Sequence, residues 1–120
     1  MDVPTQAHLH TLRELLLYRR RELMSEVHAA DLSRQAAASS SGAEVTTHAD
    51  GASQRALSDV DVAQDERDRS ELAQVDAALA RLDQGVYGDC SDCGEPIPLQ
   101  RLMVQPAAAR CAACQAAFEH

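Results

Sequence analysis

Residues 90–114 read CSDCGEPIPLQRLMVQPAAARCAAC and contain all four cysteines of the chain, as two C-x2-C pairs separated by seventeen residues. Two thiolates two residues apart reach one ion from a tight turn, and two such turns complete a tetrahedron with Zn–S distances of about 2.3 Å. This spacing is typical of a four-cysteine zinc site. The sequence therefore predicts that one structural Zn²⁺ is bound by Cys90, Cys93, Cys111 and Cys114.

Four protein ligands leave no open coordination position, whereas a catalytic zinc keeps one for water. We therefore expect a structural metal and no enzymatic activity. The alternative is two thioredoxin-like redox pairs, which need a βαβ context that the sequence does not indicate. No stretch has the pattern of a signal peptide or a membrane span, and cysteine pairs without an export signal are typical of metal ligands in the cytoplasm.

Bulky apolar side chains are scarce. The chain has 120 residues, of which 22 are alanine, one is phenylalanine, two are tyrosine and none is tryptophan. A globule held only by hydrophobic burial is therefore not expected. The chain has a net charge of −8, whereas a DNA- or RNA-binding protein normally has a basic surface patch. An acidic chain is better suited to a partner with a basic surface.

Two long segments have helical periodicity. The first, about residues 5–40, carries a narrow apolar stripe, and the second, about residues 52–85, repeats it with a 3-4-3-4 spacing. The stripe residues are Leu9, Leu12, Leu16, Leu23, Val27 and Ala30, then Leu72, Val75, Leu79, Leu82 and Val86. Such narrow stripes are typical of a coiled-coil seam; a helix packed on a separate globule is the alternative.

We therefore expect a mainly α protein. A monomeric, antiparallel two-helix coiled-coil hairpin over residues 1–86, with its tip at about 41–51, precedes a four-cysteine zinc-finger module over residues 87–120. Each arm of about 33 residues would be roughly 50 Å long. Gly85 would end the second helix, Gly94 would adopt a positive φ after the first cysteine pair, and residues 112–118 would form a short final helix.

Prolines 96, 98 and 106 are expected to keep the segment between the cysteine pairs from forming a regular helix. Near the tip, Asp61 and Asp65 fall on the seam line, and an Arg34–Asp61 pair would compensate for them. Exposed ion pairs contribute only about 0–1 kcal/mol. The half of the hairpin near the tip is therefore predicted to be the less stable half.

Asp50 is the other informative residue, because it lies at the tip of the expected arm. Its carboxylate is either a cap of the second helix, since aspartate accepts hydrogen bonds from the free N–H groups of a first turn, or a functional group. The residues alone leave both readings open.

The helical hairpin and the cysteine motif together resemble one known protein family. The run YGDCSDCGEPI at residues 87–97, followed by Arg101-Leu102, Pro106 and the second cysteine pair, resembles the DksA/TraR family of bacterial zinc-finger transcription factors. The resemblance extends over about residues 5–118. It implies a protein that binds RNA polymerase rather than DNA and inserts its hairpin through the secondary channel, the pore by which nucleotides reach the active site.

The family tip carries a D-x-x-D-x-A motif. Here Asp50 and Ala52 match the second Asp and the Ala, while Thr47 stands where the first Asp is usual. The resemblance therefore implies that Asp50 modulates promoter open complexes from within the channel.

Some family members act with ppGpp, which binds between factor and polymerase. Arg67 is the candidate contact here, whereas Gln74 and Gln115 are neutral where lysines would be expected. Two other functions stay open: a Gre-like cleavage factor, which would need a second tip carboxylate beside Asp50, and an acidic zinc adaptor for another protein.

Overall fold

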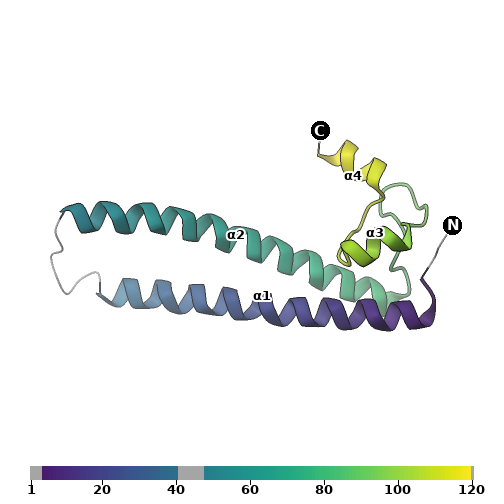
Figure 1. Ribbon diagram of the computed structural model, residues 1–120, viewed down its shortest axis with the longest axis horizontal. Helices are drawn as coiled ribbons and strands as arrows, with labels where there is room; N and C mark the ends of the chain where they lie inside the picture. The colour runs from purple at the N-terminus through teal and green to yellow at the C-terminus, as the bar shows by residue number, and fades with distance from the viewer. Residues whose placement is uncertain (1–3, 41–47, 120) are drawn as a thin grey trace. The chain divides into compact units, whose positions relative to one another are not determined.

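The computed structural model describes residues 4–40 and 48–119, and the side chains of residues 4–38 and 59–119. It contains α1 (Gln6–Ser40), α2 (His48–Gln84), α3 (Leu99–Val104) and α4 (Ala112–Phe118) (Figure 1). The described residues form no strand, and only one isolated β-bridge joins Asp89 to Pro96. The prediction of a mainly α chain is confirmed. No described helix is long and apolar enough to cross a membrane.

The chain divides into two compact units. The base unit comprises residues 1–20 and 73–120, and the arm unit comprises residues 21–72. Within each unit, α1 and α2 lie side by side and antiparallel (Figure 1). The base unit also contains α3, α4 and all four cysteines.

A reciprocal pair of hydrogen bonds sets the start of α1. The His8 N–H donates to the Thr5 Oγ1 at 3.3 Å, and the Thr5 N–H donates to the His8 Nδ1 at 3.1 Å. Thr5 therefore satisfies one of the free N–H groups of the first turn, and His8 takes the place that glutamate or glutamine has in a capping box. This stabilises the helix at the residue where the sequence predicted its start.

The end of α2 is fixed by Gly85, as predicted. Its φ of +76° is one that residues with a Cβ rarely adopt. The Gly85 N–H donates to the Leu82 carbonyl at 3.3 Å and the Val86 N–H to the Arg81 carbonyl at 3.0 Å, which is the Schellman pattern. Val86 lies beyond this break and is exposed, so the prediction that it continues the seam is wrong.

The core of the base unit joins the hairpin to the cysteine module. Leu12 of α1 is fully buried in a cluster with Cys90, Ile97 and Leu102, and Leu102 comes from α3. Further along the helices, the buried seam side chains are Leu16, Val75 and Ala78. Two ion pairs, Arg13–Asp83 and Arg20–Asp76, at 3.1 and 2.7 Å, lie beside this seam and join α1 to α2.

Two helices differ from those that the sequence predicted. The segment between the cysteine pairs is not one regular helix, as expected, but the sequence did not predict the short helix α3, which lies between Pro98 and Pro106. Pro98 stands directly before its first residue, where the missing N–H has no helical partner to lose. The second long helix begins at His48, ahead of the expected start near residue 52.

The arm unit has a different seam. Leu23 is its one fully buried leucine among the described side chains, and Asp65 and Asp68 of α2 are also buried, with 7% of each residue exposed. Since residues 61, 65, 68 and 72 continue the 4-3-4 spacing of the seam, aspartates occupy positions that apolar side chains fill in the base unit.

Candidate functional site

The first cysteine pair lies in a tight turn. The Cys90 N–H donates to the Glu95 carbonyl and the Gly94 N–H donates to the Cys90 carbonyl, each at 2.9 Å. Gly94 has a φ of +79°, which confirms the predicted need for glycine after the pair. The turn therefore directs Cys90 and Cys93 towards one point.

The second pair is tied to the first through the backbone. Both the N–H and the Oγ of Ser91 donate to the Ala109 carbonyl, at 2.8 and 3.0 Å. Cys111 is the N-cap residue of α4, and its carbonyl accepts from the Gln115 N–H at 2.9 Å. The final helix thus begins at the metal centre, with the bounds that the sequence predicted.

The four Sγ atoms of the cysteines lie within 4.8 Å of one another. The Sγ atoms of Cys93 and Cys111 are 3.9 Å apart, close to the edge of about 3.8 Å that a tetrahedron with Zn–S distances of about 2.3 Å requires. The donor set therefore fits one Zn²⁺ with no open position, and the prediction of a single structural zinc is confirmed.

The pKa values of the cysteine thiols also favour a bound cation at this site. Backbone hydrogen bonds, chiefly from Cys111 and Cys93, lower the pKa of Cys90 to about 6. The pKa of Cys114 is raised to about 12, chiefly by its hydrogen bond with the Cys111 side chain. Four crowded thiols cannot all ionise without a compensating positive charge, which a bound dication supplies.

Arg110 holds the parts of the module together. Its guanidinium lies 3.9 Å from the centre of the Phe118 ring in α4 and donates to Asp92 at 2.8 Å. The Arg101 Nε donates to the Arg110 carbonyl at 3.0 Å. Both arginines of the module are therefore engaged in internal contacts.

Tyr87 connects the start of the module to the segment that precedes the second cysteine pair. Its hydroxyl donates to the Pro106 carbonyl at 2.8 Å, and burial raises its pKa to about 12. The hydroxyl therefore remains protonated and keeps donating at physiological pH.

The predicted tip residues lie at the start of α2. Asp50 and Ala52 are its third and fifth residues, where the structure describes the backbone alone, and Thr47 lies outside the described residues. Asp50 lies in the first turn of α2, and the alternative that its carboxylate caps this helix stays a prediction. A carboxylate in a first turn still interacts favourably with the helix dipole.

Arg67 lies in the arm unit, and its side chain donates only to the neighbouring Gln64 at 3.3 Å among the contacts described for it. A guanidinium held so weakly is available to a ligand. Its assignment to ppGpp stays a prediction.

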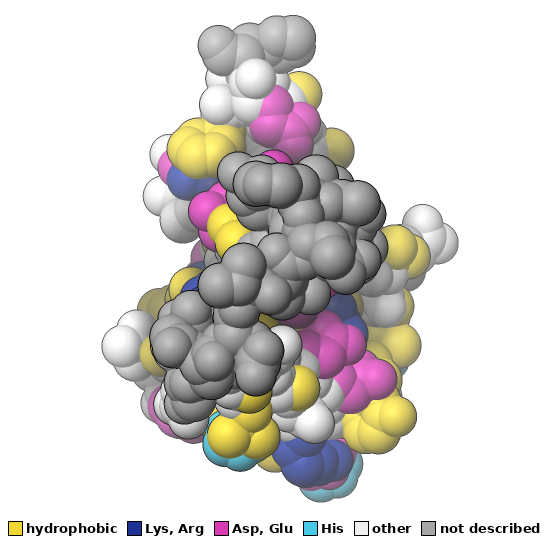
Figure 2. All heavy atoms as spheres, turned by 90° about the vertical axis from the view of Figure 1, so that its left-hand side faces the viewer, with side chains coloured by type: hydrophobic (Ala, Val, Ile, Leu, Met, Phe, Trp, Pro, Cys, Tyr) yellow, Lys and Arg dark blue, Asp and Glu magenta, His cyan; other side chains and the backbone are white. Residues whose placement is uncertain are grey.

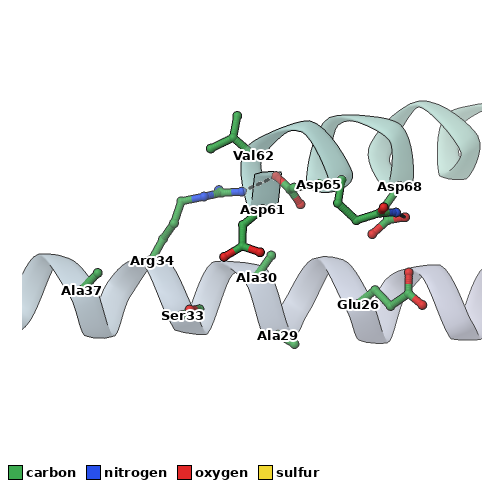
Figure 3. Close-up of a pocket in the computed structure, with 11 residues that line it drawn as sticks. Glu26, Ala29, Ala30, Ser33, Arg34, Ala37, Asp61, Val62, Asp65 and Asp68 are labelled. Atoms are coloured by element: carbon green, nitrogen blue, oxygen red, sulfur yellow. Dashed lines mark hydrogen bonds and ion pairs between the residues drawn. The ribbon is translucent and has the colours of Figure 1, made fainter. Parts of the chain in front are cut away.

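An ion-pair network crosses the arm unit, and Figure 3 shows its Arg34–Asp65 pair. Arg34 of α1 pairs with Asp65 of α2, so the predicted Arg34–Asp61 pair is wrong. Arg69 donates to Asp65 at 2.9 Å and to Asp31 at 2.6 Å, while Arg34 also contacts Asp31 at 3.2 Å. Asp65 lies one turn further from the tip, at the seam position opposite Arg34.

The hydrogen bond from Arg69 and the charge of Arg34 hold the pKa of Asp65 below its usual 3.8, against the effect of burial. The sequence reasoning missed Asp31, Asp68 and Arg69. Two signals were present: the i,i+4 spacing of Asp65 and Arg69, which brings side chains together on a helix, and the continued seam spacing at Asp68.

Comparisons with known proteins agree with this geometry. A family model described as the prokaryotic dksA/traR C4-type zinc finger matches residues 85–120. The solved structure of transcription factor DksA2 from Pseudomonas aeruginosa is 31% identical, with a TM-score of 0.77, over 95% of this chain and 84% of that one.

Two sequence relatives are named RNA polymerase-binding transcription factor DksA. The protein from Caulobacter vibrioides is 42% identical over 69 residues, which cover 54% of this chain and 48% of that protein. The protein from Haemophilus influenzae is 32% identical over 71 residues, which cover 59% and 49%. The chain thus matches about half the length of these two relatives. These two relatives and DksA2 from Pseudomonas aeruginosa are all named as transcription factors, not enzymes.

Proposed function

Since this chain belongs to the DksA/TraR family of C4 zinc-finger proteins, we propose that it binds bacterial RNA polymerase and regulates initiation without contacting DNA. The observation that carries the proposal is the likeness to DksA2 over 95% of the chain, because it includes the hairpin helices as well as the finger. The names of the relatives from Caulobacter and Haemophilus supply the partner.

The hairpin is the part that enters the polymerase. α1 and α2 have 35 and 37 residues, so each has a contour length of about 50 Å at the usual helical rise. Two helices with few bulky side chains fit a narrow pore that a globule would not enter. The proposed entry point is the secondary channel, with Asp50 and Ala52 delivered towards the active site.

The mechanism proposed for the tip is allosteric. A factor shifts an equilibrium only by its differential affinity for the competing states. Asp50 would therefore bind more favourably to a state that precedes the stable open complex, and sensitive promoters, such as those of ribosomal RNA, would lose open complexes. The protein would act in the cytoplasm as a monomer.

A nucleotide contact is proposed for Arg67, which would bind a phosphate of ppGpp at the interface with polymerase. Arginine is suited to this because its planar guanidinium can bind phosphate through two hydrogen bonds. Because Thr47 stands where the first aspartate of the D-x-x-D-x-A motif is usual, Asp50 is the one aspartate of this motif in the chain.

Direct binding to polymerase tests the proposal. The full chain, labelled at its N-terminus and loaded with zinc, is titrated with bacterial core RNA polymerase, and a Gre factor that occupies the secondary channel is added as competitor. We expect saturable binding that the competitor displaces. An absence of binding, or binding that the competitor leaves unchanged, contradicts insertion into the channel.

The variant Arg67→Ala tests the proposed ppGpp contact separately from polymerase binding. It should bind core polymerase as the wild type does, yet gain nothing from added ppGpp. If ppGpp enhances the wild type and the variant equally, the assignment of Arg67 is wrong.

A further inference from the structure

The arm unit contains a groove of about 520 Å³ between α1 and α2 (Figure 3). Its α1 side is lined by small residues, Ala29, Ala30, Ser33 and Ala37. Packed helices lie about 8–10 Å apart, and larger side chains normally fill the space between them. The groove therefore exists because these four side chains are too small to fill the seam.

Carboxylates dominate the rest of the lining. Glu26, Asp61, Asp65 and Asp68 lie along it, and Arg34 is the one basic residue among the lining side chains. Acidic side chains are also visible at several places among the described atoms in the space-filling view (Figure 2). The groove thus has a net negative charge.

Asp65 provides a second, independent observation. Its side chain is only 8% exposed, and its Oδ2 accepts from both Arg34 and Arg69. Its Oδ1 is buried and accepts no hydrogen bond from any residue that the structure describes, and the carboxylate lies between the two helices (Figure 3). An unpaired carboxylate oxygen with no exposed surface is costly, so a donor that enters the groove and displaces the side chains covering this oxygen would be favourable there.

The arrangement of the carboxylates indicates the kind of donor. Among the described side chains, the four cysteines form the one group of three or more potential ligands whose atoms converge within 4.8 Å. The groove carboxylates are instead spread along two helices. A metal ion requires convergent oxygen ligands, whereas a long side chain ending in several N–H donors fits a spread set.

We propose that this groove accepts a lysine or arginine side chain of the partner protein, which pairs with the exposed Asp61, lies beside Asp68, and reaches the Asp65 Oδ1 once the side chains that cover this oxygen move aside. The inference deepens the proposed function, since the partner is RNA polymerase and the groove lies on the arm that enters it. The occupant follows from charge complementarity: an acidic groove with an unpaired acceptor selects a cationic donor.

Two pairs of variants test the groove. Asp61→Asn removes an exposed carboxylate of the lining, and Asp59→Asn makes the same change two residues away, outside the lining. Ser33→Lys supplies a cation from within the chain and fills the groove, and Gln35→Lys adds the same charge outside it. The measured quantities are the Kd for core polymerase and the melting temperature.

We expect Asp61→Asn to weaken binding about fivefold and Ser33→Lys about tenfold, within the range of charge pairs at interfaces. Both controls should bind within about twofold of the wild type. Ser33→Lys should melt no lower than Gln35→Lys, because its ammonium pairs with the groove carboxylates. If both groove variants bind as their controls do, while the wild type binds polymerase, the groove is not a contact and only this inference is overturned.

Binding of small cationic ligands to the isolated protein tests the groove independently of polymerase binding. The ¹⁵N-labelled chain is titrated with hexalysine and, separately, with spermidine. Amide shifts at Ser33, Asp61 and Asp65 on adding hexalysine, absent in Ser33→Lys, support the groove even if the wild type fails to bind polymerase. Absence of these shifts, or shifts with spermidine alone, overturns the assignment to a protein side chain.

Discussion

Asp65 occupies a seam position where the base unit would place an apolar side chain. Two arginines, Arg34 and Arg69, make its charged form favourable, and they hold its pKa below 3.8. A buried carboxylate with such partners depends on them, because removing either partner leaves a poorly compensated charge. The residue therefore couples the packing of α1 and α2 to protonation.

The sign of this coupling follows from the lowered pKa. Asp65 contributes stability at pH values above its unfolded pKa of about 3.8, and that contribution is lost as the pH falls through the lower folded value. We therefore predict that the wild type is more stable than Asp65→Asn at pH 6 and that the difference shrinks steadily below pH ~4. Urea unfolding followed by circular dichroism measures this difference.

Asp59→Asn is the matched control for this experiment, because it removes an exposed carboxylate of the same helix. It should keep the pH profile of the wild type. A stability difference between wild type and Asp65→Asn that stays constant from pH 6 to pH 2.5 would show that the ion pairs of Asp65 contribute nothing specific.

Sequence reasoning found residues whose roles depend on local chemistry. The spacing of the cysteines and the positive φ of Gly85 and Gly94 follow from rules that act over a few residues. The partner of Arg34 could not be found in this way. Whether it pairs with Asp61 or Asp65 depends on how the two helices are placed along each other, and a one-turn difference leaves the sequence pattern unchanged.

At the scale of the helix, α1 and α2 change character along their length. In the base unit the described seam buries Leu12, Leu16, Val75 and Ala78, whereas the arm unit buries Leu23 together with two aspartates. Burial of a leucine-sized side chain contributes about 1.5–3 kcal/mol, and ion pairs between partly exposed groups contribute less. Among the described side chains, apolar burial therefore contributes more to the seam in the base unit than in the arm unit.

Hydrogen exchange should report this difference. We predict that backbone amides of residues 21–38 and 59–72 exchange at least about tenfold faster than those of residues 9–20 and 73–82, since local opening is easier where fewer apolar contacts are lost. Exchange measured by NMR at neutral pH and low salt tests this prediction. Slower exchange in the arm unit would contradict it.

The sequence predicted the long helices well because a repeated apolar stripe is a signal summed over many residues. It missed α3, whose six residues are too few for periodicity to show. Here tertiary packing decides the outcome: Leu102 is buried in one cluster with Leu12 and Ile97, and this burial stabilises the short helix between Pro98 and Pro106.

At the scale of the whole chain, the zinc centre is a structural clamp rather than a reactive site. Cys90 belongs to the same buried cluster as Leu12, Ile97 and Leu102, so the metal ligands and the base of the hairpin share one core. Metal binding to such a module contributes directly to its folding free energy, because the unfolded chain has no preformed site.

Removal of zinc should therefore unfold the base unit first. We predict that a strong chelator lowers the melting temperature by roughly 10 °C or more and exposes amides of residues 88–118, and that added Zn²⁺ restores both. Calorimetry and hydrogen exchange, with released zinc measured by a colorimetric indicator, test this. An unchanged melting temperature after stoichiometric zinc release would contradict the structural role.

We propose that the arm delivers Asp50 to the polymerase and thereby destabilises open complexes. The most direct test is the half-life of open complexes at a ribosomal RNA promoter, measured with the wild type, Asp50→Asn and the control Asp59→Asn. The account predicts that the wild type and the control shorten the half-life about fivefold or more, whereas Asp50→Asn binds polymerase with unchanged affinity and leaves the half-life at its factor-free value. A half-life shortened equally by Asp50→Asn, or unaffected by the wild type, would contradict this role of Asp50.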